Sequence, residues 1–185
     1  MSAIDKIKLA KKASGSLAIA STLQKNTALE EIAKLLVASE AEIISENQKD
    51  LARAKTEGLS AGLQDRLMLN AERISGLASA VRQLVSLPDP IGEAVRGMTL
   101  PNGLKLSEIR VPFGVVGAIY EARPNVTIDI SALALKSGNA VVLRGGTAAE
   151  NTNIALVKVL QQGLTKAGLS GDLVQTVDDF GREGA

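Results

Sequence analysis

Two short segments that are apolar throughout, VVGAIY at 115–120 and AVVL at 140–143, alternate with helical patterns in the second half of the chain. The helical patterns cover about 127–136 and 149–167, and a third apolar segment follows at 173–177. Strands without polar alternation are buried on both faces, and strands that alternate with helices form parallel sheets. The pattern predicts an α/β fold with a Rossmann-type parallel sheet covered on both faces.

The first 87 residues have the spacing of amphipathic helices. Ser2 and Asp5 have the spacing of a capping box, which predicts a helix start. The apolar face of this first helix is expected to consist of Ile4, Ile7, Ala10, Ala13 and Leu17. We therefore expect the chain to begin with amphipathic helices whose apolar faces pack against a hydrophobic core.

Two further helical regions are expected before residue 88. The second begins at Asn26 or Thr27, because Thr27 and Glu30 form another capping box, and Gly58 ends it. The third covers about 60–87 and restarts near Asn70. The prolines that stop it are Pro88 and Pro90.

In residues 91–111, apolar and polar residues alternate, so the hydrophobic pattern repeats every two residues. Two short alternating runs flank Pro101-Asn102-Gly103. An Asn-Gly pair between alternating runs is a strong signal for a β-hairpin. We therefore expect a hairpin between the helices and the parallel sheet.

Composition excludes several kinds of catalysis. The chain of 185 residues contains no Cys and no His, so thiol catalysis, Ser-His-Asp catalysis and the usual zinc sites are excluded for this chain alone, and no metal site is expected. The net charge is only +1 and is spread along the chain, which argues against nucleic-acid or membrane-surface partners. Without a long apolar run or a signal-peptide pattern, a cytoplasmic protein is the default expectation.

Polar residues directly follow the first apolar strand. Tyr120, Glu121, Ala122, Arg123 and Asn125 lie between that strand and the next helix. Ligands of open α/β sheets bind at the carboxyl ends of parallel strands. The segment is therefore a candidate binding site, although surface loops often carry such residues and a structural role is an equally good interpretation.

The turn Arg144-Gly145-Gly146-Thr147 after the next strand is a second candidate. Thr147 and Glu150 have capping-box spacing, so a helix is expected to begin there. Free backbone N–H groups at a helix start attract anions, and Arg144 adds a forked cation for a ribose or phosphate. The turn is neither a G-x-G-x-x-G fingerprint nor a Walker loop, and such turns are common without a nucleotide.

These residues carry a resemblance to a known family. The runs VPFGVVGAIYEARPNVTIDISALALKSGNAVVLRGG, LQDRL and LPDPIGE are similar to the corresponding blocks of γ-glutamyl phosphate reductase, or glutamate-5-semialdehyde dehydrogenase, of the aldehyde dehydrogenase superfamily. The resemblance covers an N-terminal portion of that family. It implies an aldehyde-dehydrogenase-like fold in three parts: an N-terminal helical segment of the cofactor-binding domain at 1–90, a hairpin of the oligomerisation element at 91–111, and a partial NADP-binding domain at 112–185.

The resemblance also implies roles for single residues. Asn125 resembles the asparagine whose amide helps to form the oxyanion hole, while the cysteine nucleophile of the family lies beyond Ala185. Thr147 stands where NAD-preferring relatives have an acid, so NADP is expected, although Ala148 follows where relatives commonly have an acid. The implied cofactor-binding residues are Tyr120, Glu121, Ala122, Arg144, Gly145, Gly146 and Thr147.

Arg123 is a candidate for substrate binding on chemical grounds. A forked cation at a strand end suits the acyl phosphate or the α-carboxylate of a γ-glutamyl substrate. A structural salt bridge to Glu121 or Asp129 is an equally good interpretation.

By resemblance, the complete enzyme reduces L-γ-glutamyl 5-phosphate with NADPH to L-glutamate 5-semialdehyde and phosphate in proline biosynthesis. It is expected to be a cytoplasmic homo-oligomer that is functionally coupled to glutamate 5-kinase. A sheet with few strands and an open edge indicates a chain that is cut short, so we expect this chain alone to be inactive. The alternative is a non-catalytic fragment that acts only as a nucleotide-binding or assembly module.

Overall fold

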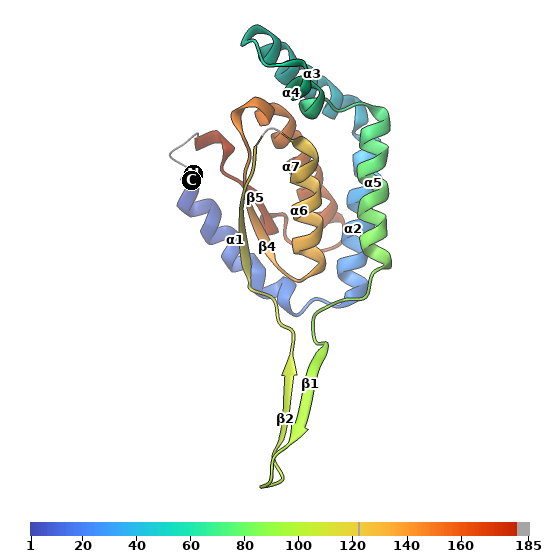
Figure 1. Cartoon of the computed structure of the whole chain (residues 1–185), viewed down its shortest axis with the longest axis vertical. Helices are drawn as coiled ribbons and strands as arrows, with labels where there is room; N and C mark the ends of the chain where they lie inside the picture. The colour runs from blue at the N-terminus through green and yellow to red at the C-terminus, as the bar shows by residue number, and fades with distance from the viewer. Residues whose placement is uncertain (122, 181–185) are drawn as a thin grey trace.

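The computed structural model describes residues 1–121 and 123–180 (Figure 1). The α-helices are α1 (Ala3–Ala18), α2 (Thr22–Ala38), α3 (Glu40–Thr56), α4 (Ala61–Leu67), α5 (Ala71–Ser86), α6 (Pro124–Lys136) and α7 (Glu150–Lys166). The strands are β1 (Ala94–Thr99), β2 (Lys105–Ile109), β3 (Val115–Ile119), β4 (Ala140–Arg144) and β5 (Val174–Thr176). Two short 3-10 helices, η1 (Thr147–Ala149) and η2 (Gly171–Leu173), precede α7 and β5.

The second half of the chain forms the predicted parallel sheet. Its strand order is β3-β4-β5, and both pairings are parallel, with Ile119 opposite Arg144 at the carboxyl end. The first four residues of the central strand β4 are buried. The α/β fold class and the strand and helix order of this half are confirmed.

Helices cover the two faces of the sheet unequally. Helices α6 and α7 pack on one face, and α2 and α5 form a further layer outside them. Helix α1 packs on the other face, mainly against β4 and β5 (Figure 1). The prediction of cover on both faces therefore holds for β4, but Ile119 of β3 is 72% exposed.

One hydrophobic core joins the N-terminal helices to the sheet. Helix α2 contributes Leu29, Ile32 and Leu36 to it, and all three are fully buried. Gly163 lets α7 approach α2 closely, because a Cβ at this position would lie 2.5 Å from Cγ1 of Ile32. The helices before residue 88 and the sheet therefore pack as one unit.

The predicted β-hairpin is present and projects away from the helices (Figure 1). Strands β1 and β2 pair antiparallel, and Gly103 in the turn has a φ of 84°, which favours glycine. Every residue of both strands is exposed. At the base of the hairpin, the buried Lys25 of α2 forms an ion pair of 2.5 Å with Asp89.

The capping box of Ser2 and Asp5 is confirmed, but other details of the helix predictions are wrong. Helix α2 begins at Thr22 behind the cap Ser21, and Thr27 instead donates its hydroxyl to the carbonyl of Leu23 inside the helix. The expected single helix up to Gly58 is two helices that meet at Ser39. The two helices join there without a Gly or Pro, so the sequence carried no strong break signal.

The apolar face of α1 also differs from the prediction. Ala10 and Leu17 are buried as expected, but Ile4 is 63% and Ile7 44% exposed. Ala3 in the first turn of α1 packs against the core, whereas Ile4 and Ile7 face away from it. Among the described helices, none combines the length and the apolar character that a membrane span requires.

Candidate functional site

Both candidate segments lie at the carboxyl edge of the sheet, on the side where α3 and α4 lie (Figure 1). Tyr120 follows β3, and its backbone N–H donates to the carbonyl of Arg144 at the end of β4, over 3.0 Å. The parallel register thus places the two turns beside each other, as parallel strands require. Glu121 is exposed there, and the predicted residue Ala122 lies outside the described residues.

A buried polar network connects the two turns. The hydroxyl of Tyr120 lies 2.6 Å from that of Thr127, and the Thr127 hydroxyl donates to the side-chain carbonyl of Asn153 over 2.9 Å. The Asn153 amide donates to Asp178, whose other carboxylate oxygen accepts the backbone N–H of Gly145 over 2.6 Å. Burial raises the pKa of Tyr120 to about 12. The Tyr120 hydroxyl is therefore neutral at physiological pH.

Gly145 is required by this network. A Cβ there would lie 2.1 Å from Nδ2 of Asn153 and 3.3 Å from Oδ2 of Asp178. Any side chain would displace Asn153 from its place between α6 and the strand ends. The glycine in this turn is therefore explained by a close approach inside the protein, without a ligand.

The start of α7 differs from the predicted anion site. Neither Thr147 nor Glu150 makes a capping hydrogen bond at the start of η1 or α7. The fully buried carboxylate of Asp50, on α3, instead accepts the backbone N–H groups of Asn151 and Thr152 over 3.3 and 2.8 Å. The capping-box prediction was wrong because a residue about a hundred positions away satisfies these groups.

Asp50 has further partners. Its carboxylate accepts hydrogen bonds from the Asn151 amide (2.8 Å), the Thr152 hydroxyl (2.6 Å) and the Arg53 guanidinium (2.8 Å). Arg53 also donates to the backbone carbonyl of Thr147 over 2.5 Å. These contacts fix the turn after β4 to α3.

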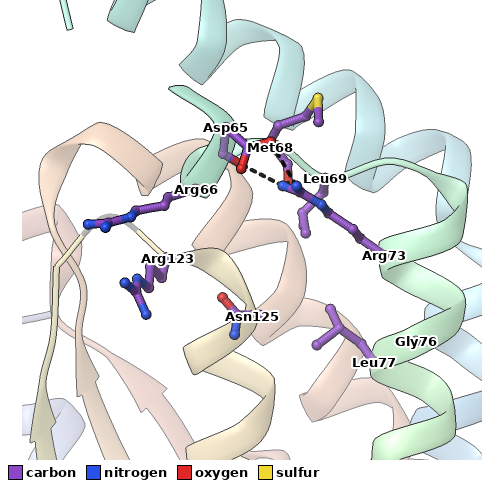
Figure 2. Close-up of a pocket in the computed structure, with 9 residues that line it drawn as sticks. All are labelled: Asp65, Arg66, Met68, Leu69, Arg73, Gly76, Leu77, Arg123 and Asn125. Atoms are coloured by element: carbon purple, nitrogen blue, oxygen red, sulfur yellow. Dashed lines mark hydrogen bonds and ion pairs between the residues drawn. The ribbon is translucent and has the colours of Figure 1, made fainter. Parts of the chain in front are cut away.

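A pocket of about 490 Å³ opens beside the start of α6 (Figure 2). It lies between α4, the start of α5 and the start of α6. Its lining residues are Asp65, Arg66, Met68, Leu69, Arg73, Gly76, Leu77, Arg123 and Asn125. The structure thus brings the predicted Arg123 and Asn125 together with residues about fifty positions earlier.

The predicted catalytic residue Asn125 is oriented by its own helix. Its side-chain N–H donates to Asp129, one turn later on α6, over 3.2 Å. Burial raises the pKa of Asp129, and the hydrogen bond from Asn125 partly offsets this effect. A side-chain amide has two N–H groups, so one remains for a ligand.

The three arginines of the pocket differ in whether their side chains are paired. Arg73 is paired with the carboxylate of Asp65 over 2.8 Å and donates to the carbonyl of Met68 over 2.9 Å (Figure 2). Within the described ranges, the side chains of Arg66 and Arg123 have no hydrogen bond or ion pair. The salt bridge of Arg123 to Glu121 or Asp129, one of the two interpretations of this residue, is absent.

Sequence reasoning missed Asp50 and Arg66. The buried positions of α3 are Ile43, Asn47, Asp50 and Ala54, at three- and four-residue steps. Two polar residues on an apolar stripe are a signal of buried hydrogen bonding that the sequence contained. Arg66 lies in the LQDRL run, but no local feature of that run indicated which pocket it lines. Among the residues that the structure describes, no three His, Cys, Asp or Glu side chains are grouped as metal ligands.

The fold is that of the aldehyde dehydrogenases. A probable aldehyde dehydrogenase from Listeria monocytogenes superposes with a TM-score of 0.75 at 18% identity, over 98% of this chain and 37% of that chain. No protein-family model matches the sequence.

Proteins with higher sequence identity to this chain show which aldehyde dehydrogenase family it is related to. A γ-glutamyl phosphate reductase from Leifsonia xyli is 60% identical over 98% of this chain and 43% of its own length. The crystal structure of the Thermotoga maritima γ-glutamyl phosphate reductase has a TM-score of 0.96 at 36% identity, over 99% of this chain and 44% of that one. The yeast protein of the same name gives 0.89 at 31% identity, over 96% of this chain and 46% of that one. The chain is therefore homologous to an N-terminal portion of γ-glutamyl phosphate reductases, and it spans less than half of their length.

Proposed function

We propose that this chain is part of an enzyme that reduces L-γ-glutamyl 5-phosphate with NADPH to L-glutamate 5-semialdehyde and phosphate, in the cytoplasmic synthesis of proline. The observation that carries the proposal is the 60% identity to a protein named γ-glutamyl phosphate reductase over 98% of this chain. A pocket at the strand ends that contains an oriented amide and three arginines, two of them without a counter-ion among the described residues, supports it.

The residues at the end of β4 suit the ribose of the adenosine end of NADPH, but not its pyrophosphate. Two amides of α7 and the amide of Gly145 are already engaged by Asp50 and Asp178. A pyrophosphate held on these amides therefore does not fit. A contact of Arg144 and Thr147 with the ribose and its 2′-phosphate does fit, and Gly146 and Tyr120 complete the proposed cofactor segment. When bound, NADPH would supply the hydride.

Asn125 has the position and the partner expected of an oxyanion donor. Asp129 holds one of its N–H groups, and this fixes the plane of the amide before substrate arrives. The second N–H is then directed at the carbonyl oxygen of the γ-acyl group, where negative charge develops during the reaction. A donor that is already oriented has no reorganisation cost in the transition state.

The hairpin favours a second role, as an assembly element of a homo-oligomer. Its strands are exposed on both faces and carry apolar side chains that are about half exposed: Val95, Met98, Leu106 and Ile109. A two-stranded ribbon of this kind is only marginally stable alone and offers free edges for pairing. If the chain has no catalytic partner segment, assembly through this hairpin is what remains of its function. Functional coupling to glutamate 5-kinase stays a proposal from the resemblance alone.

The proposed function is tested with a hybrid in which this chain replaces the matching segment of the Leifsonia xyli reductase. We expect the hybrid to form NADPH from NADP, glutamate 5-semialdehyde and inorganic phosphate, which is the reverse reaction. The 185-residue chain alone should give no turnover, because it has no Cys to form a thioester. A hybrid that folds, binds ATP but not NADPH, and gives no turnover would contradict the proposal.

Arg144→Ala in the hybrid should raise the KM for NADP about ten- to a hundredfold, because a charge-assisted hydrogen bond is lost. Initial rates at varied NADP measure this. Lys158→Ala is the control, since Lys158 is an exposed cation on α7 that pairs with Glu42 away from the strand ends. An unchanged KM for NADP, with the same thermal melting as the parent, would return Arg144 to a structural role.

A further inference from the structure

We infer that Arg66 and Arg123 together form the binding site for the phosphate group of the substrate, and for inorganic phosphate as product. This inference rests on the proposed function, which it extends by a residue, Arg66, and by a defined part of the substrate. Arg66 lies in the last turn of α4, and Arg123 is the residue before α6. Only the tertiary structure brings them into one pocket (Figure 2).

The first argument is charge. Asp65 is the one acidic side chain that lines the pocket, and it is already paired with Arg73 over 2.8 Å. In the part of the chain that the structure describes, this leaves the charges of Arg66 and Arg123 without a counter-ion. Two guanidinium groups without counter-ions in one concave site give it a positive potential, and this potential attracts an anion.

The second argument is the start of α6. This helix has no side-chain cap and no acidic residue in its first turn, and Pro124 occupies its first position. The helix dipole therefore adds positive potential beside Asn125. At α7, by contrast, Asp50 caps the first amides. Of the two helix starts at the strand ends, only α6 is open to an anion.

The third argument is the chemistry of the substrate. Phosphate is bonded to the acyl carbon whose oxygen Asn125 is proposed to stabilise, so its binding site must adjoin that amide. Arg123 is two positions from Asn125, and Arg66 lines the same pocket. Each guanidinium presents a planar fork of donors that matches two phosphate oxygens. In the forward reaction a cysteine thiolate from outside this chain would form a thioester bond to the acyl carbon while the acyl C–O bond breaks, so that phosphate leaves with both bonding electrons. Arg66 and Arg123 would stabilise the negative charge that phosphate carries away.

The reverse reaction gives a direct test, because inorganic phosphate is then a substrate. In the hybrid, Arg66→Gln should raise the KM for phosphate about ten- to a hundredfold, while the KM for NADP stays the same. Arg66→Lys should recover only part of the loss, since an ammonium group lacks the fork. Arg82→Gln is the matched control, because Arg82 is an exposed arginine of α5 that pairs with Glu30 outside the pocket.

A second measurement separates this inference from the proposed function. The 185-residue chain is titrated with inorganic phosphate, and the amide signals of residues 123–127 are followed by NMR. We expect shifts that Arg66→Gln removes and Arg82→Gln keeps. If the hybrid is active but Arg66→Gln leaves the KM for phosphate unchanged, or raises the KM for the aldehyde instead, the phosphate site is wrong and the proposed function stands. If the hybrid is inactive while the Arg66-dependent shifts persist, the anion site stands and the proposed function fails.

Discussion

Asp50→Ala should destabilise the chain by about 3–5 kcal/mol, because it leaves five donor groups without their common acceptor. Two of these donors are the first backbone amides of α7, which is buried against α2, α3 and α6. Urea unfolding followed by circular dichroism measures the loss, and amide hydrogen exchange should accelerate first at Asn151 and Thr152.

The control lies one turn earlier on the same helix. Glu46→Gln removes an exposed ion pair with Lys49, and such pairs contribute about 0–1 kcal/mol. Asp50→Asn keeps the shape but replaces one acceptor oxygen by a donor, so it should also lose several kcal/mol. An Asp50→Ala chain within about 1 kcal/mol of the parent would mean that water replaces the carboxylate, and that the start of α7 is open after all.

Asn125→Ala should lower kcat of the hybrid by on the order of a hundredfold, with little change in the KM for NADP. The reason is that an oxyanion donor interacts most strongly with the transition state and does not contact the adenosine end. Initial rates in the reverse direction, at saturating phosphate and aldehyde, measure kcat.

Two further variants separate a donor from a packing residue. Asn125→Asp is nearly isosteric but has no N–H at the side chain, so it should be at least as slow as Asn125→Ala. Asp129→Asn keeps Asn125 and weakens only its orientation, so we expect a smaller fall in kcat. If Asn125→Asp retains the parent rate while the fold is intact by circular dichroism, the amide is not the donor.

The two helix starts at the strand ends show how differently local sequence can be used. The turn before α7 has the features of an anion site, with an arginine, two glycines and capping-box spacing, yet Asp50 and Asp178 occupy its amides. The start of α6 has a proline and no capping residue. The less conspicuous of the two is the one left open, and this is why the phosphate site is proposed there.

The sequence by itself determined the order and kind of most elements. Short apolar runs that alternate with helical patterns predicted parallel strands, and Asn102-Gly103 between alternating runs predicted a tight turn, because these patterns depend on local backbone geometry and on burial. The resemblance of residues 111–146 likewise indicated the family from the sequence alone. Both kinds of information are local in the chain.

Only the tertiary structure decided what those elements contact. Three features join residues that are far apart in sequence. They are the cap of α7 by Asp50, the network that requires Gly145, and the pocket that Arg66 and Arg123 both line. A carboxylate or guanidinium satisfies whichever group the packing brings within hydrogen-bond distance, and sequence spacing does not encode that distance. The positions of helices α3 and α4 over the strand ends therefore decided which helix start is capped and which remains open to a ligand.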